Sequence, residues 1–162
     1  MVSPITWLGS SDLTLDGKNR VVIPRRFQAG LDRDRDPDGR TTAIITRGFE
    51  GCLFVFAERT FEQLLERMKT QAFEGPSERK MQRLFFSGSH HCALDSAGRL
   101  LIPDKLRKLV GIAKDVVLVG VIDRLEIWPR ERWEAFESES AEDFDELDQV
   151  LFGSADGDVP QP

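Results

Sequence analysis

Short apolar runs separated by turn-forming residues recur along most of the chain and predict a β-rich fold. Near the N-terminus, Leu13 and Leu15 alternate with polar neighbours, as in a half-buried strand. A turn containing glycine and asparagine comes next, and a second apolar run covers residues 20–23, so this region is predicted to form a β-hairpin with a loop of three to five residues. Pro24 ends the second strand because it has no backbone donor, and a short helix is expected over residues 25–30.

The same unit occurs a second time in the second half of the chain. Residues 16–27 read DGKNRVVIPRRF, and residues 95–106 read DSAGRLLIPDKL. Aspartate, arginine, isoleucine and proline keep identical spacing, and a leucine precedes each copy. The second copy therefore predicts the same strand, turn and strand, with its short helix over residues 105–110. Each copy alone spans only about fifty residues, so we expect two similar lobes that share one core.

Two further apolar runs follow the motif in each half and predict a second hairpin there. In the first half they cover residues 42–46 and 52–56, and in the second half residues 116–119 and 125–128. The runs in the first half flank residues 47–51, and those in the second half are joined by a segment that also contains glycine. The repeat therefore extends beyond the first motif.

Three longer helices are predicted around these hairpins, over residues 58–72, 78–86 and 130–139. The apolar face of the first consists of Phe61, Leu64, Leu65 and Met68. The second is expected to begin after Ser77 as its N-cap. The side chains it is expected to turn inward are Met81, Leu84 and Phe85. The aromatic residues interpreted as core or interface, rather than as platforms for stacked bases, are Phe54, Phe56, Phe61, Trp128 and Trp133.

Composition divides the chain into four parts. The first repeat is expected over residues 5–73, a linking helix over 77–86, the second repeat over 88–137, and an acidic, largely disordered tail over 138–162. Residues 32–40 combine alternating charges with proline and glycine, so they are predicted to form a solvated loop inserted into the first repeat.

The overall composition is that of a soluble globular protein, with 40% hydrophobic and 31% charged residues. No apolar run approaches the roughly 18 residues of a membrane span, and the N-terminus lacks the basic and apolar regions of a signal peptide. We therefore expect a cytoplasmic protein that has no membrane partner.

The residues with catalytic or metal-binding potential are few. Cys52 and Cys92 are too few for a disulfide framework and lack the spacing of metal motifs. His90 and His91 would be the residues of an acid–base or metal site, but no phosphate loop, carboxylate pair or second ligand cluster accompanies them. The sequence therefore predicts no enzyme, no cofactor, no metal and no small-molecule substrate.

The net charge of −6 is unevenly distributed. From Glu134 onward there are ten acidic residues and no lysine or arginine, so residues 1–133 carry about four more basic than acidic residues. An acidic tail on a mildly basic body neither argues against nucleic-acid binding nor establishes it.

A compact group of basic residues surrounds the first motif. Lys18, Arg20, Arg25 and Arg26 lie between residues 17 and 30, a stretch without any acidic residue. Lysine and arginine neutralise phosphates regardless of sequence, whereas one guanidinium can also read a guanine edge with two hydrogen bonds. We therefore predict that Arg20 reads bases and that the other three contact phosphates. The alternative for the motif is an ion pair that only fixes the turn.

The second motif carries a more balanced charge. It offers Arg99, Lys105, Arg107 and Lys108, but Asp104 stands where the first copy has an arginine. The second motif is therefore expected to serve structure or a subunit interface more than DNA, and one hairpin per chain is predicted to read DNA.

With both repeats laid out, the chain resembles the MraZ family of bacterial transcriptional regulators. The resemblance rests on LDGKNRVVIP (15–24), on its second copy with Asp95, Arg99 and Pro103, on RLFFSG (83–88) and on LEIW (125–128). It covers roughly residues 5–137. The acidic tail is not part of the pattern.

This resemblance implies an α+β, β-rich fold in which two tandem AbrB-like hairpin repeats form one pseudo-two-fold β-barrel with peripheral helices. It implies a ring-shaped homo-oligomer, associated with the nucleoid, that binds double-stranded DNA at short direct repeats upstream of its own division and cell-wall operon. The motif residues Asp16, Pro24, Asp95 and Pro103 are then structural, and the family's DNA-contacting arginine corresponds to Arg20 and Arg99. The alternative is an antitoxin-like or scaffold protein of the same barrel type that acts by binding protein.

Overall fold

The computed structural model describes residues 7–31, 35–69, 75–147 and 150. The chain divides into two units, Met1–Arg130 and Glu131–Pro162, which are described separately. The strands of the described residues all belong to the first unit: β1 (Trp7–Thr14), β2 (Arg20–Val22), β3 (Thr42–Arg47), β4 (Leu53–Phe56), β5 (His90–Ala93), β6 (Arg99–Leu101), β7 (Asp115–Ile122) and β8 (Arg124–Pro129).

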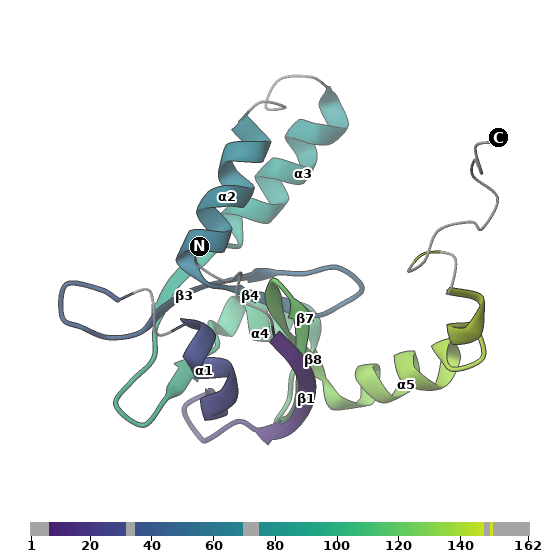
Figure 1. The fold of residues 1–162 in the computed structure, drawn as a ribbon, viewed down its shortest axis with the longest axis horizontal. Helices are drawn as coiled ribbons and strands as arrows, with labels where there is room; N and C mark the ends of the chain where they lie inside the picture. The colour runs from purple at the N-terminus through teal and green to yellow at the C-terminus, as the bar shows by residue number, and fades with distance from the viewer. Residues whose placement is uncertain (1–6, 32–34, 70–74, 148–149, 151–162) are drawn as a thin grey trace, which may run out of the picture. The chain divides into compact units, whose positions relative to one another are not determined.

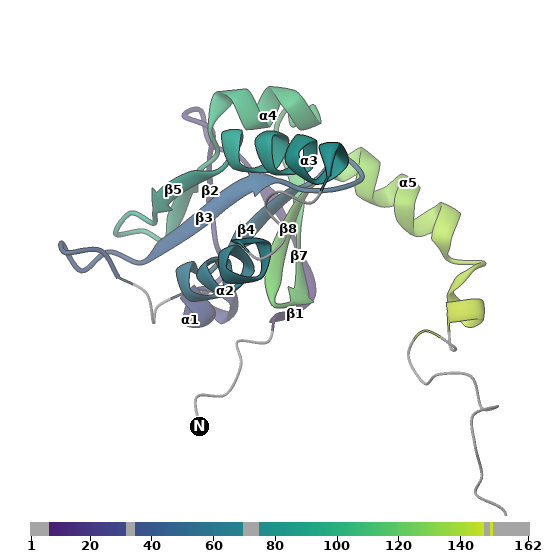
Figure 2. The ribbon, with the colours of Figure 1, turned by 90° about the horizontal axis from the view of Figure 1, so that it is seen from above.

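Four helices accompany these strands: α1 (Arg25–Leu31), α2 (Glu58–Lys69), α3 (Pro76–Ser87) and α4 (Asp104–Val110). Helices α2 and α3 project from the strands in Figure 1, and Figure 2 shows them from above. The second unit contains α5 (Arg130–Ser140), which starts at the last residue of the first unit, and a short 3-10 helix over Phe144–Leu147.

The strands form two antiparallel sheets that are symmetric between the repeats. The larger has the order β1-β7-β8-β4-β3-β5, and the smaller pairs β2 with β6. The two repeats make β1 equivalent to β5, β3 to β7 and β4 to β8. With these equivalences, the strand order of the larger sheet is the same from either end. Val21 and Leu100, which occupy the same position of the two motifs, pair with each other. A pseudo-two-fold axis therefore runs between β2 and β6 and between β4 and β8.

The predicted β-barrel is confirmed only as this mostly antiparallel, two-repeat arrangement with helices. The larger sheet is not closed, because β1 and β5 form its two edges in the described part of the chain. Each repeat nevertheless contributes a strand that pairs with the other repeat: β1 pairs with β7, and β5 pairs with β3.

The hairpins predicted from residues 13–23 and from the second copy of the motif are both wrong, because β5 pairs with β3 and β6 pairs with β2. β1 pairs with β7 and β2 pairs with β6, so the two arms of the motif belong to different sheets. The Asp16 N–H still donates to the Arg20 carbonyl (2.8 Å), which closes the turn itself. The longer register with β7, from Trp7 to Thr14, determines where β1 lies. The hairpin predicted from residues 42–56 is confirmed as β3 and β4, and that from residues 116–128 is confirmed as β7 and β8.

The repeated apolar positions form the core. Leu15, Val21, Ile23 and Phe27 of the first motif are buried, and so are their equivalents in the second, Leu94, Leu100, Ile102 and Leu106. By contrast, Val22 and Leu101 point outward and are each 52% exposed. This alternation is what a strand covered on one face requires. Each buried aliphatic or aromatic side chain contributes about 1.5–3 kcal/mol to folding.

The helix predictions needed three corrections. Helix α3 begins at Pro76 after Gly75, with no side-chain cap, so Ser77 is not its N-cap. Of its three expected inward residues only Phe85 is buried, because Met81 and Leu84 lie on an exposed face. Helix α2 ends at Lys69, and residues 70–72 of the prediction lie outside the described residues. Trp133 packs against Phe136 within α5, where the structure buries no residue, rather than in a core.

Candidate functional site

The first motif folds into a turn organised by one carboxylate. Asp16 Oδ1 accepts hydrogen bonds from the backbone N–H groups of Lys18 (2.9 Å) and Arg20 (3.0 Å), and Oδ2 accepts one from Arg20 Nε (2.8 Å). Asn19 takes a left-handed conformation with φ of 59°. The spacing of the motif follows from this geometry: an aspartate to bind the turn, a residue that tolerates positive φ in fourth place, and an arginine in fifth.

The Asp16 carboxylate is held in its charged form. The backbone N–H of Arg20, together with the N–H of Lys18 and the Arg20 guanidinium, lowers the pKa of Asp16 below its usual 3.8. The aspartate therefore stays ionised at neutral pH and fixes the Nε edge of the arginine. The terminal nitrogens of that guanidinium are the donors left for a further partner.

The second motif repeats this turn bond for bond. Asp95 Oδ1 accepts from the backbone N–H groups of Ala97 and Arg99, both at 2.9 Å, and Oδ2 accepts from Arg99 Nε at 2.6 Å. Gly98, with φ of 73°, takes the place of Asn19. The pKa of Asp95 is lowered in the same way, mainly by the backbone N–H of Arg99 and then by its side chain.

The pseudo-two-fold axis brings the two turns together. The Ile23 N–H donates to the Gly98 carbonyl (2.9 Å), and the Ile102 N–H donates to the Asn19 carbonyl (3.0 Å), so the bonds flanking β2 and β6 are symmetric. The side chains of Arg20 and Arg99 are 26% and 34% exposed. Arg20, predicted to read bases, and Arg99, its counterpart in the second motif, thus lie at one partly exposed place, and neither is sequestered in the core.

The other basic residues predicted to contact DNA differ in their surroundings. Lys18 and Arg25 are exposed. Arg26 Nη2 donates to the Ser10 carbonyl (2.6 Å) and to Ser11 Oγ (2.7 Å), which ties α1 to the edge strand β1. Arg26 also lies over the Phe27 ring, with its Cζ 4.7 Å from the centroid. The structure therefore gives Arg26 a structural role that the sequence did not predict.

Pro24 and Pro103 stand directly before α1 and α4, as predicted for structural residues. The Pro24 carbonyl accepts from the Gln28 N–H (3.1 Å), and the Pro103 carbonyl accepts from the Arg107 N–H (2.9 Å). β2 ends at Val22 and β6 at Leu101, so each proline lies two residues beyond its strand and directly before its helix.

The basic residues of the second motif are partly neutralised, as its sequence predicts. Asp104 Oδ1 lies 2.7 Å from Arg107 Nη2, and Oδ2 lies 2.6 Å from Lys108 Nζ. Hydrogen bonds from Lys108 and Arg107 lower the pKa of Asp104. The helix start of the second repeat therefore presents less free positive charge than that of the first.

Sequence reasoning missed a third turn of the same kind. Asp36 Oδ1 accepts from the Arg40 N–H (2.8 Å) and Oδ2 accepts from Arg40 Nε (2.7 Å), while Gly39 has φ of 77°. The signal was present in the sequence DPDGR (36–40), which has aspartate, glycine and arginine at the motif's spacing. The sequence prediction for residues 32–40 was a solvated loop without this turn, and residues 32–34 lie outside the described residues. This turn is not part of the β2–β6 pair.

The residues considered for catalysis lack a reactive arrangement. Burial raises the pKa of both Cys52 and Cys92 to about 12, so neither thiol is a nucleophile at neutral pH. His91 Nδ1 lies 3.5 Å from Glu58 Oε1. Among the described residues, no group of three or more His, Cys, Asp or Glu side chains is placed to hold a metal ion. Within the same residues, every helix is too short or too polar to span a membrane.

Comparison with known families places these paired turns in context. The family model described as "MraZ protein, putative antitoxin-like" matches the chain twice, over residues 7–84 and 85–154. The chain belongs to the MraZ family. Each match contains one of the two turns at the axis, so the MraZ repeat corresponds to the structural repeat. The boundary between the matches falls within α3, near its C-terminal end.

Proposed function

We propose that this MraZ-family chain is a sequence-specific DNA-binding transcriptional regulator. Its expected target is a set of short direct repeats upstream of its own operon of division and cell-wall genes. Several copies, arranged as a homo-oligomeric ring, would bind these repeats together in the cytoplasm, on the nucleoid.

The observation that supports this proposal best is the pairing of the two motif turns at the pseudo-two-fold axis. Each aspartate holds the Nε edge of its arginine, so the guanidinium is oriented before it meets a ligand. An arginine held in this way is suited to two-point recognition of a guanine, because little conformational entropy is lost on binding. The exposed Lys18 and Arg25 supply charge for nearby phosphates.

One pair of turns is a small surface for tight binding. Specific protein–DNA interfaces bury about 1,000–2,500 Å² of protein surface. A ring carrying many copies would meet this need, because several weak contacts to repeated DNA boxes act through effective concentration. This explains why repeated boxes, rather than a single site, are the expected target.

A footprint on the DNA upstream of the chain's own gene tests the proposal. We expect protection of two or more short direct repeats, and weaker binding when the spacing between them is changed by half a helical turn. Uniform protection along the fragment, or binding that ignores the spacing, would contradict sequence-specific reading by an assembly.

A second candidate function is that of an antitoxin-like or scaffold protein acting through protein contacts. It is favoured by the description of the matching family and by the exposed apolar side chains near α3, among them Phe49 and Leu84. A protein of this kind would bind its partner with the motif arginines removed. Retained partner binding by an Arg20→Ala protein, together with no footprint for the wild type, would favour it.

A further inference from the structure

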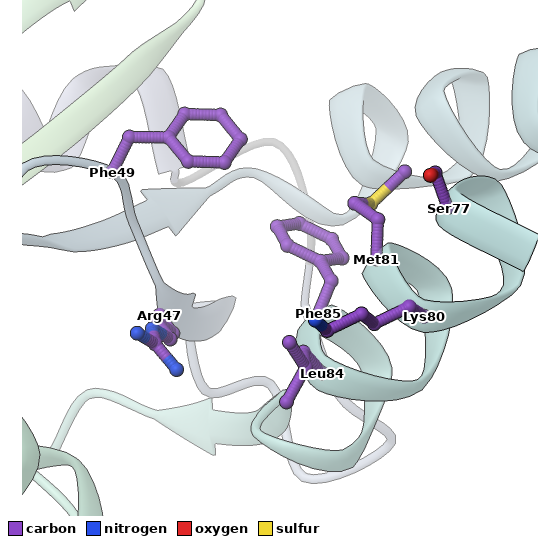
Figure 3. A pocket seen from close by; sticks show the side chains of 7 residues that line it. All are labelled: Arg47, Phe49, Ser77, Lys80, Met81, Leu84 and Phe85. Carbon is purple, nitrogen blue, oxygen red and sulfur yellow. The ribbon is translucent and has the colours of Figure 1, made fainter.

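An apolar groove lies between the β3–β4 turn and helices α2 and α3. A cavity of about 300 Å³ is lined by Phe49, Met81, Leu84 and Phe85, among others. A second cavity of about 290 Å³ shares three of these residues and extends along α2 to Leu64 and Met68. We call this surface the α2–α3 groove and define it by Phe49, Leu64, Met68, Met81, Leu84 and Phe85. In Figure 3 the side chains of Phe49, Met81 and Phe85 surround one end of it.

The groove leaves large apolar side chains exposed. Phe49 is 65% exposed, Leu84 51% and Met81 37%, while Phe85 is buried beneath them and stacks on Phe61 with ring centroids 6.2 Å apart. Exposed apolar residues gathered around a hollow mark an interaction surface rather than ordinary scatter. Methionine side chains adapt their shape to a partner, which suits a docking groove.

The charges at the groove select the kind of partner. Arg47 and Lys80 line the first cavity (Figure 3), and Arg67 and Arg124 line the second. Asp123 is the acidic residue among the lining side chains. Arg124 pairs with it at 3.4 Å and with Glu126 at 2.8 Å, so Arg47 and Lys80 supply the positive charge at the margin of the groove. An occupant that places apolar side chains in the groove and carboxylates at its margin would match this pattern.

The second unit of the chain has that composition. Its exposed large apolar residues are Phe136, Phe144, Leu147 and Val150. Acidic residues surround them, and no lysine or arginine follows Arg132. Within the described residues, α5 buries none of its side chains. One chain therefore carries a basic-edged apolar groove and, over residues 134–147, an acidic segment with exposed apolar residues.

We propose that the α2–α3 groove of one copy binds the acidic segment of another copy, centred on Phe144 and Leu147. This inference rests on the homo-oligomer of the proposed function and names the contact that holds copies together. The contact joins two different surfaces, so it passes from copy to copy in one direction and can close into a ring. None of the groove residues belongs to the paired turns, so a substitution in the groove leaves the DNA-contacting side chains in place.

Cross-linking between copies tests this contact. Two full-length variants, Leu84→Cys in the groove and Phe144→Cys in the acidic segment, are mixed and oxidised. Cys52 is buried and Cys92 is half-buried, and wild-type protein oxidised in the same way measures the background from these two thiols. We expect a disulfide-linked dimer that forms only in the mixture, and its loss when Lys80→Glu is added to the groove variant.

The matched control replaces Leu84→Cys by Arg79→Cys, which lies on the same helix outside the residues that line the groove. We expect little cross-linking for this pair. Equal yields from both pairs would overturn the proposal, and so would a dimer formed by the Leu84→Cys protein alone, which would mean that grooves meet each other. An uncross-linked mixture would also overturn it and leave an acidic segment of another protein as the occupant.

The same samples are tested for DNA binding before oxidation, with thermal melting to establish that each variant is folded. No cross-link in the mixture of the Leu84→Cys and Phe144→Cys proteins, when both still bind promoter DNA, would contradict this inference alone. A specific cross-link in proteins that bind no DNA would contradict the proposed function alone.

Discussion

Arg20 and Asp95 belong to different copies of the same turn, yet Arg20 Nη1 lies 3.7 Å from Asp95 Oδ2. The arginine of the first repeat is thus held by its own aspartate and approached by that of the second. This contact exists because β2 and β6 pair across the pseudo-two-fold axis. The two turns therefore act as one structural element, although they are far apart in the sequence.

This relationship predicts that a change in the second turn alters the first. Asp95→Asn removes the charge that faces Arg20 and weakens the turn holding Arg99, so we expect about 3- to 30-fold weaker promoter binding. Gel shift at fixed salt measures the effect. Asp36→Asn makes the same change in the unpaired third turn and serves as the control. Wild-type affinity in the Asp95→Asn protein would show that the turns work independently.

The aspartates predict acid sensitivity with a defined sign. Hydrogen bonds to the charged forms lower the pKa of Asp16 and Asp95 below 3.8 in the folded protein. Their contribution to the free energy of unfolding is therefore present above about pH 4 and is lost as the pH falls through the folded values. Thermal melting between pH 7 and pH 3 should show a smaller drop for an Asp16→Asn, Asp95→Asn protein than for wild type. Parallel curves would contradict this assignment.

Asp104 is predicted to limit DNA contact by the second repeat. Asp104→Asn removes one negative charge and weakens the ion pairs to Arg107 and Lys108. We expect about 2- to 10-fold tighter DNA binding at low salt, with the gain shrinking as salt rises. A salt titration of the gel shift measures this. Unchanged affinity at every salt concentration would mean that this helix start lies away from the DNA.

Gly30 is predicted to be required for the packing of Trp7. A Cβ at position 30 would lie 2.5–2.7 Å from atoms of the Trp7 indole, whose Nε1 donates to the Phe27 carbonyl at 3.0 Å. Gly30→Ala should therefore lower the free energy of unfolding by about 1–3 kcal/mol, despite the better helix propensity of alanine. Gly17→Ala, which meets nothing within 4 Å, is the control for denaturant unfolding. A Gly30→Ala protein with a higher free energy of unfolding than wild type would contradict this prediction, because Trp7 would then move without loss of stability.

The sequence predicted those features that depend on neighbours along the chain. The motif turn was predictable because the hydrogen bonds among Asp16, Asn19 and Arg20 all lie within five residues of the chain. The short helices were predictable because a proline marks where each of them begins. The pairs of neighbouring strands β3–β4 and β7–β8 were predicted as well, but pairing between distant strands was not, since the partner of β2 is β6 rather than β1.

Two details of the candidate surfaces also escaped the sequence. Helical spacing grouped Met81 and Leu84 with Phe85, but it does not tell a face that meets the core from a face that borders an open groove. The turn at Asp36 was missed because its charged, proline-containing surroundings resemble a plain loop, although its aspartate–arginine spacing matches the motif.

The account depends on Arg20 at the paired turns, and one comparison tests it directly. Arg20→Ala and Arg40→Ala each remove an arginine whose N–H and Nε bond the aspartate of its own turn. Only Arg20 of the two belongs to the β2–β6 pair, and Arg40 also bonds Asp38. Binding to the DNA upstream of the gene is measured by gel shift, and the mass of each oligomer by light scattering. We expect Arg20→Ala to abolish the shift with the oligomer unchanged, and Arg40→Ala to bind like wild type. A normal shift by Arg20→Ala, or an equal loss in both proteins, would contradict the account.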